Sequence, residues 1–204
     1  MTLVIKNLSQ SKGQSTLFRH LCFALEKGRQ VLVQGANGAG KSTLLKIIAG
    51  LQSPDKGEIT WQGHPLFSDK AQYFSHMSYL GHQNGLKRSL TPRENIEELL
   101  CLANANATCE KIERVFEDFA LTEHANQRCE TLSAGECRKV ALAAVILKNK
   151  PLWLLDEPFN SLDKASYQRM QTSCQQHLAS GGMIILSTHQ GSHHYDNSQI
   201  ICLS

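Results

Sequence analysis

One eight-residue segment, Gly-Ala-Asn-Gly-Ala-Gly-Lys-Ser at residues 35–42, constrains the fold more than any other part of the sequence. It matches the pattern G-x-x-x-x-G-K-[ST] at every fixed position. A β-rich run at 29–34 precedes it, and an apolar stripe at helical spacing over 42–49 follows it. A strand, a glycine-rich turn and a helix in this order favour a parallel α/β sheet.

The glycines of this segment allow the loop to turn back, so that successive backbone N–H groups point inward. Inward N–H groups at the start of a helix cradle an anion such as a phosphate chain. Lys41 would reach the β and γ phosphates, and the Ser42 hydroxyl would bind Mg²⁺. A glycine-rich turn that only opens a helix is the structural alternative. The predicted nucleotide-binding residues are Gly35, Ala36, Asn37, Gly38, Ala39, Gly40, Lys41, Ser42 and Thr43.

A second candidate site element is the apolar run 152–155, which ends in the acids Asp156 and Glu157. Ligands gather at the carboxyl edge of open α/β sheets, where a strand of this kind ends. A carboxylate at the end of a buried strand is costly unless it meets a metal or a partner, so Asp156 is predicted to join the Mg²⁺ shell. Glu157 is placed to act as the general base that polarises an attacking water.

The remaining pattern predicts alternating strands and helices around a helical lobe. Helices are expected at 92–103, 109–120, 133–147 and 163–179, and strands at 3–5, 22–25, 57–61, 77–80, 152–156, 183–187 and 199–203. This order predicts a parallel α/β core with an N-terminal antiparallel β-region and an inserted helical lobe. We expect one domain over residues 1–204, with the insertion at about 84–147.

Charge and composition exclude several classes of protein. Lys and Arg total 21 against 18 Asp and Glu, and their scatter gives no basic stripe that would indicate nucleic-acid binding. The longest apolar stretches are much shorter than the roughly 20 residues of a membrane-spanning helix, and no secretory leader is visible. The seven cysteines form no C-x-x-C pair, so reduced thiols are expected. A cytoplasmic chain that does not itself cross a membrane is predicted.

The segment Leu-Ser-Ala-Gly-Glu at residues 132–136, twenty residues before Leu-Trp-Leu-Leu-Asp-Glu-Pro, resembles the signature sequence of the ABC-type ATPases. The resemblance implies that Ser133 and Gly135 contact the γ-phosphate of ATP held by a second subunit. Two ATP molecules would then lie between two copies of the chain in a homodimer. Ser133 with Glu136 also reads as a capping box, and that reading is compatible with the first.

Three further elements resemble the same family. Gln83 follows the expected strand 77–80 and is similar to the Q-loop glutamine, a ligand of Mg²⁺ or of the attacking water. Residues 161–163 resemble the D-loop, and His189 resembles the switch histidine that touches the γ-phosphate. The resemblance therefore implies a catalytic set of Glu157, His189 and Gln83, and a metal set of Ser42, Gln83 and Asp156.

The chain departs from the family pattern at two places. Ala134 stands where a glycine is usual in the signature, and Glu136 stands where a glutamine is usual. In addition, the N-terminal β-region lacks the aromatic residue that commonly stacks on adenine, and the nearest aromatic is Phe18. The sequence therefore leaves the adenine-stacking residue unassigned.

A narrower resemblance covers nearly the whole chain. The string Gly-His-Gln-Asn-Gly-Leu-Lys at 81–87 is similar to the Q-loop region of the cytochrome c maturation ATPases, which are subunits of a haem exporter. This implies a peripheral subunit on the cytoplasmic side of a bacterial inner membrane, bound to integral membrane subunits. ATP hydrolysis would release haem to a periplasmic haem chaperone without direct haem binding by this chain. Leu86 and Lys87 are expected to be exposed partner contacts, and His193 and His194 are interpreted as solvated loop residues.

Three alternatives stay open at this point. The first is the ATPase of another ABC transporter, and the second is a soluble ABC-type ATPase of translation or DNA repair. The second class usually has paired cassettes or long coiled-coil insertions, for which 204 residues leave no room. The third is a small P-loop kinase, in which the segment 132–136 would have no role.

Overall fold

The computed structural model of the protein describes residues 1–188 and 198–203, and it contains two compact units. Unit 1 comprises residues 1–81, 151–158 and 177 onward, and unit 2 comprises residues 82–150 and 159–176. The expected helical insertion at 84–147 falls inside unit 2, which also includes most of the helix after residue 163. The prediction of a single domain over residues 1–204 stays a prediction.

Unit 1 contains a five-stranded sheet in which every pair of neighbouring strands is parallel, in the order β6-β7-β8-β3-β9. Its strands are β3 (Gln30–Gln34), β6 (Met77–Leu80), β7 (Leu152–Asp156), β8 (Met183–Thr188) and β9 (Ser198–Cys202). β3, β7 and β8 are apolar and buried along almost their whole length, as expected of strands covered on both faces. The predicted parallel core is therefore confirmed.

The second sheet of unit 1 is antiparallel, in the order β2-β1-β4-β5. Its strands are β1 (Thr2–Lys12), β2 (Ser15–Glu26), β4 (Lys56–Trp61) and β5 (His64–Pro65). The hairpin of β1 and β2 is much longer than the predicted strands 3–5 and 22–25. Register shifts between Ile5 and Ser11 break the two-residue alternation of apolar side chains, so the sequence pattern predicted only the regular ends of these strands.

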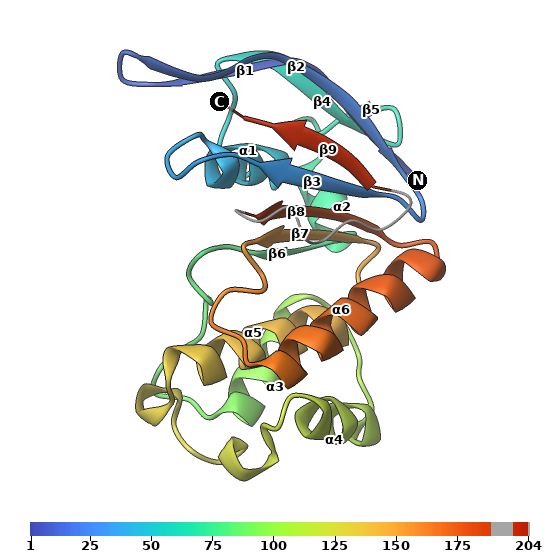
Figure 1. Ribbon diagram of the computed structural model, residues 1–204. Helices are drawn as coiled ribbons and strands as arrows, with labels where there is room; N and C mark the ends of the chain where they lie inside the picture. The colour runs from blue at the N-terminus through green and yellow to red at the C-terminus, as the bar shows by residue number, and fades with distance from the viewer. Residues whose placement is uncertain (189–197, 204) are drawn as a thin grey trace. The chain divides into compact units, whose positions relative to one another are not determined.

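Helix α1 (Lys41–Ile48) packs between the two sheets of unit 1 (Figure 1). Its buried leucines and isoleucines share one apolar core with β1, β3, β7 and β8. The short helix α2 (Lys70–Ser75), which the sequence did not predict, begins after its cap Asp69. The buried Tyr73 hydroxyl donates to the Ile48 carbonyl oxygen at 2.8 Å and so ties α2 to the end of α1.

Unit 2 is helical. It contains α3 (Pro92–Leu102), α4 (Cys109–Asp118), α5 (Ala134–Lys148), most of α6 (Lys164–Ala179) and the 3₁₀ turns η1 (Thr122–His124) and η2 (Cys129–Thr131). Capping boxes begin α3, through Thr91 and Glu94, and α5, through Ser133 and Glu136. α3 and α4 both pack on α5. In the part of the chain that the structure describes, no helix is long and apolar enough to span a bilayer.

Within unit 1 the His177 imidazole stacks on the Trp153 indole of β7, with ring centroids 3.9 Å apart and planes 8° from parallel. Its Nε2 lies 3.2 Å from the Pro151 carbonyl oxygen. A Cβ on Gly182 would collide with this ring, so the position before β8 has to be glycine. Burial lowers the pKa of His177, and the neutral ring is therefore the form that the fold accommodates.

This burial predicts a pH dependence of stability. A histidine whose folded pKa lies below its unfolded value contributes stability above about pH 6.5, and that contribution is lost as the pH falls. Between about pH 7.5 and about pH 5.5 we expect the free energy of unfolding to drop, by at most ~1.4 kcal/mol per pH unit from this group. His177→Phe, which keeps a stacking ring, should flatten this slope in denaturant titrations. His64→Ala, a change at an exposed histidine of β5, should leave the slope unchanged.

Candidate functional site

The predicted phosphate loop lies in unit 1, between the end of β3 and the start of α1. Gly40 caps α1 with a φ of 98°, a backbone conformation that favours glycine. A Cβ on Gly35 would lie 2.5 Å from the Leu203 carbonyl oxygen, because the chain after β9 closes against the loop. The nine predicted nucleotide-binding residues, 35–43, form the loop and the start of α1 at the carboxyl edge of the parallel sheet.

The Lys41 ammonium group is buried in the mouth of this loop. Its Nζ donates to the carbonyl oxygens of Gly35 at 2.8 Å and Ala36 at 3.0 Å. The Glu157 Oε1 atom lies 4.0 Å from the same nitrogen. A cation held inside a ring of backbone groups at a helix N-terminus is the arrangement that binds a polyphosphate.

The two predicted acids lie at the end of β7, next to the end of β8. Asp156 pairs in register with Ser187, and its Oδ1 accepts a hydrogen bond from the Ser187 hydroxyl at 2.6 Å. The backbone N–H of Glu157 donates to the same hydroxyl oxygen at 2.9 Å. Glu157 has a φ of 49°, in the left-handed region that is uncommon for residues other than glycine. The backbone is therefore strained at Glu157, the predicted general base, and the hydrogen bond to Ser187 holds it in this conformation.

Ser187 is the residue that sequence reasoning missed. It is fully buried and contacts both acids, yet it occupies the end of an apolar strand and belongs to no motif. The only available signal was its place directly before the segment that carries the predicted switch histidine. His189 itself, with His193 and His194, lies outside the described residues.

The donor set of unit 1 fits Mg²⁺. The Ser42 hydroxyl and the Asp156 carboxylate are hard oxygen ligands at the same edge of the sheet as the loop. Across residues 1–188 and 198–203 no cluster of three or more His, Cys, Asp or Glu side chains could hold a metal. Mg²⁺ suits such a sparse set, because it keeps several waters and binds through one or two protein oxygens plus the substrate phosphates.

The other predicted site residues lie in unit 2. Ser133 is the N-cap of α5, exposed to solvent, and its hydroxyl oxygen accepts from the Glu136 N–H at 3.2 Å. A Cβ on Gly135 would lie 2.8 Å from the Ser161 carbonyl oxygen, so the D-loop runs directly against this turn. Glycine is therefore required at 135 by packing, whereas the exposed position 134 accepts alanine.

The D-loop is tied to α5 by an ion pair. The Lys139 Nζ lies 2.5 Å from Asp163 Oδ2, and Asp163 also accepts from the Ser166 backbone N–H at 2.8 Å. These contacts, the Lys139 bond first, lower the pKa of Asp163 to about 2. Asp163 is consequently an ionised cap of α6 at every physiological pH.

Gln83 is exposed at the start of a loop, and two buried polar side chains form hydrogen bonds to that loop. Arg138 of α5 donates to the Asn84 side-chain oxygen at 3.0 Å. Asn95 of α3 donates to the carbonyl oxygens of Lys87 and Thr91, both at 3.0 Å, and its Oδ1 accepts from the Lys87 N–H at 2.8 Å.

The side chains at the far end of this loop differ from expectation in one respect. Leu86 is half-buried, so the expectation that it is exposed is wrong. Lys87 is exposed as expected and pairs with Glu98. The loop therefore offers polar rather than apolar side chains to a partner.

The aromatic residue nearest to the N-terminal β-region in the sequence, Phe18, does not lie at the phosphate loop. Phe18 is buried in the apolar core of unit 1. Its neighbour Leu17 lies against the phosphate loop instead, since a Cβ on Gly40 would lie 2.9 Å from the Leu17 Cβ. The adenine-stacking residue therefore stays unassigned.

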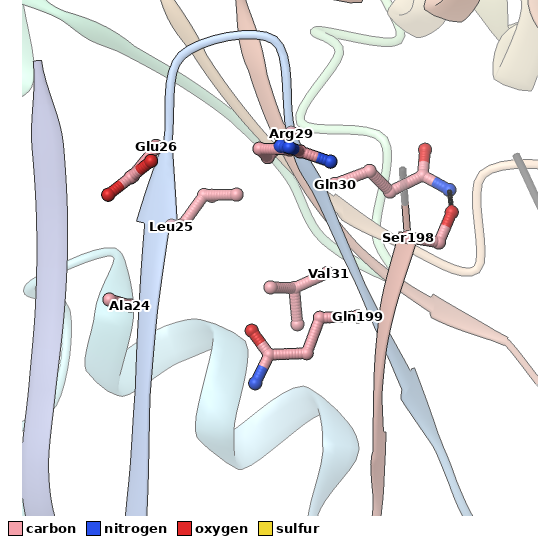
Figure 2. A pocket seen from close by; sticks show the side chains of 8 residues that line it. All are labelled: Ala24, Leu25, Glu26, Arg29, Gln30, Val31, Ser198 and Gln199. Carbon is pink, nitrogen blue, oxygen red and sulfur yellow. Dashed lines mark hydrogen bonds between the residues drawn. The ribbon is translucent and has the colours of Figure 1, made fainter. Parts of the chain in front are cut away.

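A separate cavity of about 330 Å³ lies at the amino ends of β3 and β9 (Figure 2). Gln30 and Ser198 line it and are joined by a hydrogen bond of 3.1 Å. Ligands of parallel α/β sheets bind at the opposite, carboxyl ends of the strands, where the phosphate loop is found. This cavity is therefore distinct from the nucleotide site.

Comparisons with known proteins agree with this geometry. The sequence model of the ABC transporter family matches residues 18–160. A solved structure described as the ATP-binding subunit of an ABC transporter superposes with a TM-score of 0.87 at 27% identity, covering 100% of this chain and 86% of the other. A putative ABC transporter ATP-binding protein from Pyrococcus furiosus gives a TM-score of 0.85 at 26% identity, covering 98% of this chain and 97% of the other.

Curated relatives narrow the family. The cytochrome c biogenesis ATP-binding export protein CcmA of Bordetella bronchiseptica is 44% identical over 85% of this chain and 77% of its own length. The Vibrio cholerae CcmA is 39% identical over 92% of this chain and 91% of its own. The chain belongs to the CcmA family of ABC transporter ATP-binding subunits. Like other members of the ABC family, this CcmA-type chain is an ATP-hydrolysing transporter subunit.

The bridge formed by Ser187 predicts a specific loss of catalysis. Ser187→Ala removes the hydrogen bond to Asp156 and the acceptor for the Glu157 N–H. We expect ATP turnover at saturating Mg²⁺ and ATP to fall about tenfold or more, since a hydrogen bond to a charged group contributes ~1.5–3 kcal/mol.

A matched control is Ser78→Ala on β6. The Ser78 hydroxyl is also buried in the parallel sheet, but it has no hydrogen-bond partner within the described part of the chain. Turnover of Ser78→Ala should equal that of the parent in the same assay. Equal turnover of Ser187→Ala and Ser78→Ala would show that Ser187 does not position the acids.

Proposed function

We propose that this chain hydrolyses ATP to drive the release of haem to a periplasmic haem chaperone during c-type cytochrome biogenesis. The observation that carries the proposal is the convergence, in unit 1, of the Lys41 loop and the Asp156–Glu157 pair at one sheet edge. The substrate class is supported by the relatives, whose names describe export proteins of cytochrome c biogenesis. Other transporters and soluble ABC-type ATPases are not favoured by these relatives.

The residues of unit 1 have separable roles in this proposal. Lys41 and the N–H groups of the loop hold the β and γ phosphates, and Ser42 and Asp156 supply oxygens to Mg²⁺. When bound, Mg²⁺ would neutralise charge on the phosphate oxygens. The Glu157 carboxylate orients the attacking water and accepts its proton. Gln83 and His189 are proposed as further contacts of the water, metal or γ-phosphate.

A homodimer completes the site in this proposal. Ser133 is exposed at the positive end of α5, and Gly135 lies beside it, so that both are accessible to a phosphate bound by another copy. Two ATP molecules would lie between two chains, each held by the phosphate loop of one copy and the segment 133–135 of the other. Hydrolysis would then open the dimer and move its partners.

The partners proposed are the integral membrane subunits of a haem exporter, with this chain peripheral on the cytoplasmic side of the inner membrane. The loop that begins at Gln83 suits such a contact, because Arg138 and Asn95 hold its backbone while its polar side chains face solvent. Force on a loop fixed in this way passes into α3 and α5 rather than being lost in local motion. The proposal assigns no haem ligand and no nucleic-acid contact to this chain.

The decisive experiment places Glu157→Gln in the only gene copy and measures covalently bound haem in the c-type cytochromes of the source cell. Without the general base, ATP is bound but not hydrolysed, so c-type haem should fall to background while haem b proteins are unaffected. Glu26→Gln, an exposed acid at the end of β2, should give normal c-type haem. Normal c-type haem in the Glu157→Gln strain would refute the maturation role.

A further inference from the structure

Glu136 places a negative charge at the N-terminus of the helix that is proposed to receive a phosphate. Its Oε2 accepts from the Ser133 backbone N–H at 2.7 Å, and its Oε1 lies 3.1 Å from His124 Nε2. The hydrogen bonds from Ser133 are the main reason why the pKa of Glu136 lies below its ordinary value. The carboxylate is therefore ionised and held beside Ser133.

An ionised carboxylate at this place opposes the proposed function of the helix end. The N-terminus of α5 attracts an anion because its N–H groups and dipole present partial positive charge. A carboxylate in the first turn offsets part of that positive charge and repels a phosphate bound by another copy. A glutamine, which is usual at this position in the family that the segment resembles, would avoid this repulsion. A glutamate at this position needs hydrogen-bond donors that hold its carboxylate and offset part of its charge.

His124, at the end of η1, is placed to supply such a donor through its Nε2. Its Nδ1 lies 3.2 Å from Gln127 Oε1, and the Gln127 amide nitrogen donates to the Glu123 carbonyl oxygen at 3.3 Å, which orients Oε1 toward the ring. Both ring nitrogens thus lie next to side-chain oxygens, and these contacts hold the ring against Glu136. The charge of Lys139 also lowers the pKa of Glu136, but the Lys139 ammonium group itself is paired with Asp163 at 2.5 Å.

We propose that His124 is a positioning residue for nucleotide-driven dimerisation, which holds the Glu136 carboxylate through its Nε2 so that the end of α5 can receive the γ-phosphate bound by a second copy. The Ser133 hydroxyl accepts from the Glu136 N–H, so its own proton stays available for that phosphate. The inference rests on the proposed function, because it needs a second copy of this chain that brings a nucleotide to Ser133.

The test uses the full chain with Glu157→Gln as the parent, so that ATP is not consumed. ATP-dependent dimerisation is measured by sedimentation velocity across a range of ATP concentrations with Mg²⁺. Adding His124→Ala leaves the carboxylate without this partner and should weaken dimerisation by up to about fivefold. Adding both His124→Ala and Glu136→Gln removes the charge with its partner and should restore dimerisation to the level of the parent.

Restored dimerisation in the double variant would show that His124 acts through Glu136 and does not merely support the fold. His64→Ala, at an exposed histidine of unit 1, is the matched control and should dimerise like the parent. Unchanged dimerisation of the His124→Ala chain would overturn the inference. So would a double variant that dimerises as weakly as His124→Ala alone, because the loss would then be independent of the Glu136 charge.

A second measurement distinguishes failure of the inference from failure of the proposed function. A parent chain that stays monomeric with ATP would contradict the proposed dimer. In that case the coupling between His124 and Glu136 is measured from the thermal stability of the monomer. There, His124→Ala should lower the thermal midpoint by about 2 °C, and the shift should vanish when residue 136 is glutamine. The same shift in both backgrounds would overturn the inference.

Discussion

The parallel pairing of β7 with β8 is the constraint on which the chemical site depends. This register sets Asp156 opposite Ser187, and one hydroxyl then bonds to the aspartate and to the next residue, Glu157. A slip by one residue would turn every side chain of the strand to the opposite face of the sheet. Because both strands are apolar and buried on both faces, the bonded polar pair Asp156–Ser187 at their ends is what distinguishes this register from a slipped one.

In unit 2, buried or paired polar side chains, rather than the strands of a sheet, hold the functional loops in place. Asn95 and Arg138 are both buried, and both bond to the loop that follows Gln83. Lys139 fixes the D-loop through Asp163 in the same manner. Each of these side chains joins a segment without regular structure to a helix, and a buried polar side chain is costly unless its bonds are made. The loops of this unit are therefore strongly specified, although they contain little apolar surface.

The sequence predicted well those features that depend on a local pattern. The glycine loop, the buried strand ending in Asp156, the capping box at Ser133 and Pro92 at the start of a helix all follow from residue type and spacing. Ser187 could not be predicted, because its role depends on which residue pairs with it across the sheet. The half-buried state of Leu86 depends in the same way on how the fixed loop packs on unit 2. The bulged β1–β2 hairpin escaped prediction since its irregular register removes the alternation that marks a strand.

Gly35 lies so close to the Leu203 carbonyl oxygen that the residue after β9 limits how far the phosphate loop can move. The Leu203 N–H also donates to the Gln34 carbonyl oxygen at 2.8 Å, so the two segments are joined next to this contact. Any tension applied to the chain beyond residue 203, by a fusion or a surface tether, is transmitted to the backbone that encloses the Lys41 ammonium group. Labels intended to report nucleotide binding without perturbing it belong instead on the exposed Gln14, because the φ of 61° at the neighbouring Gly13 favours glycine.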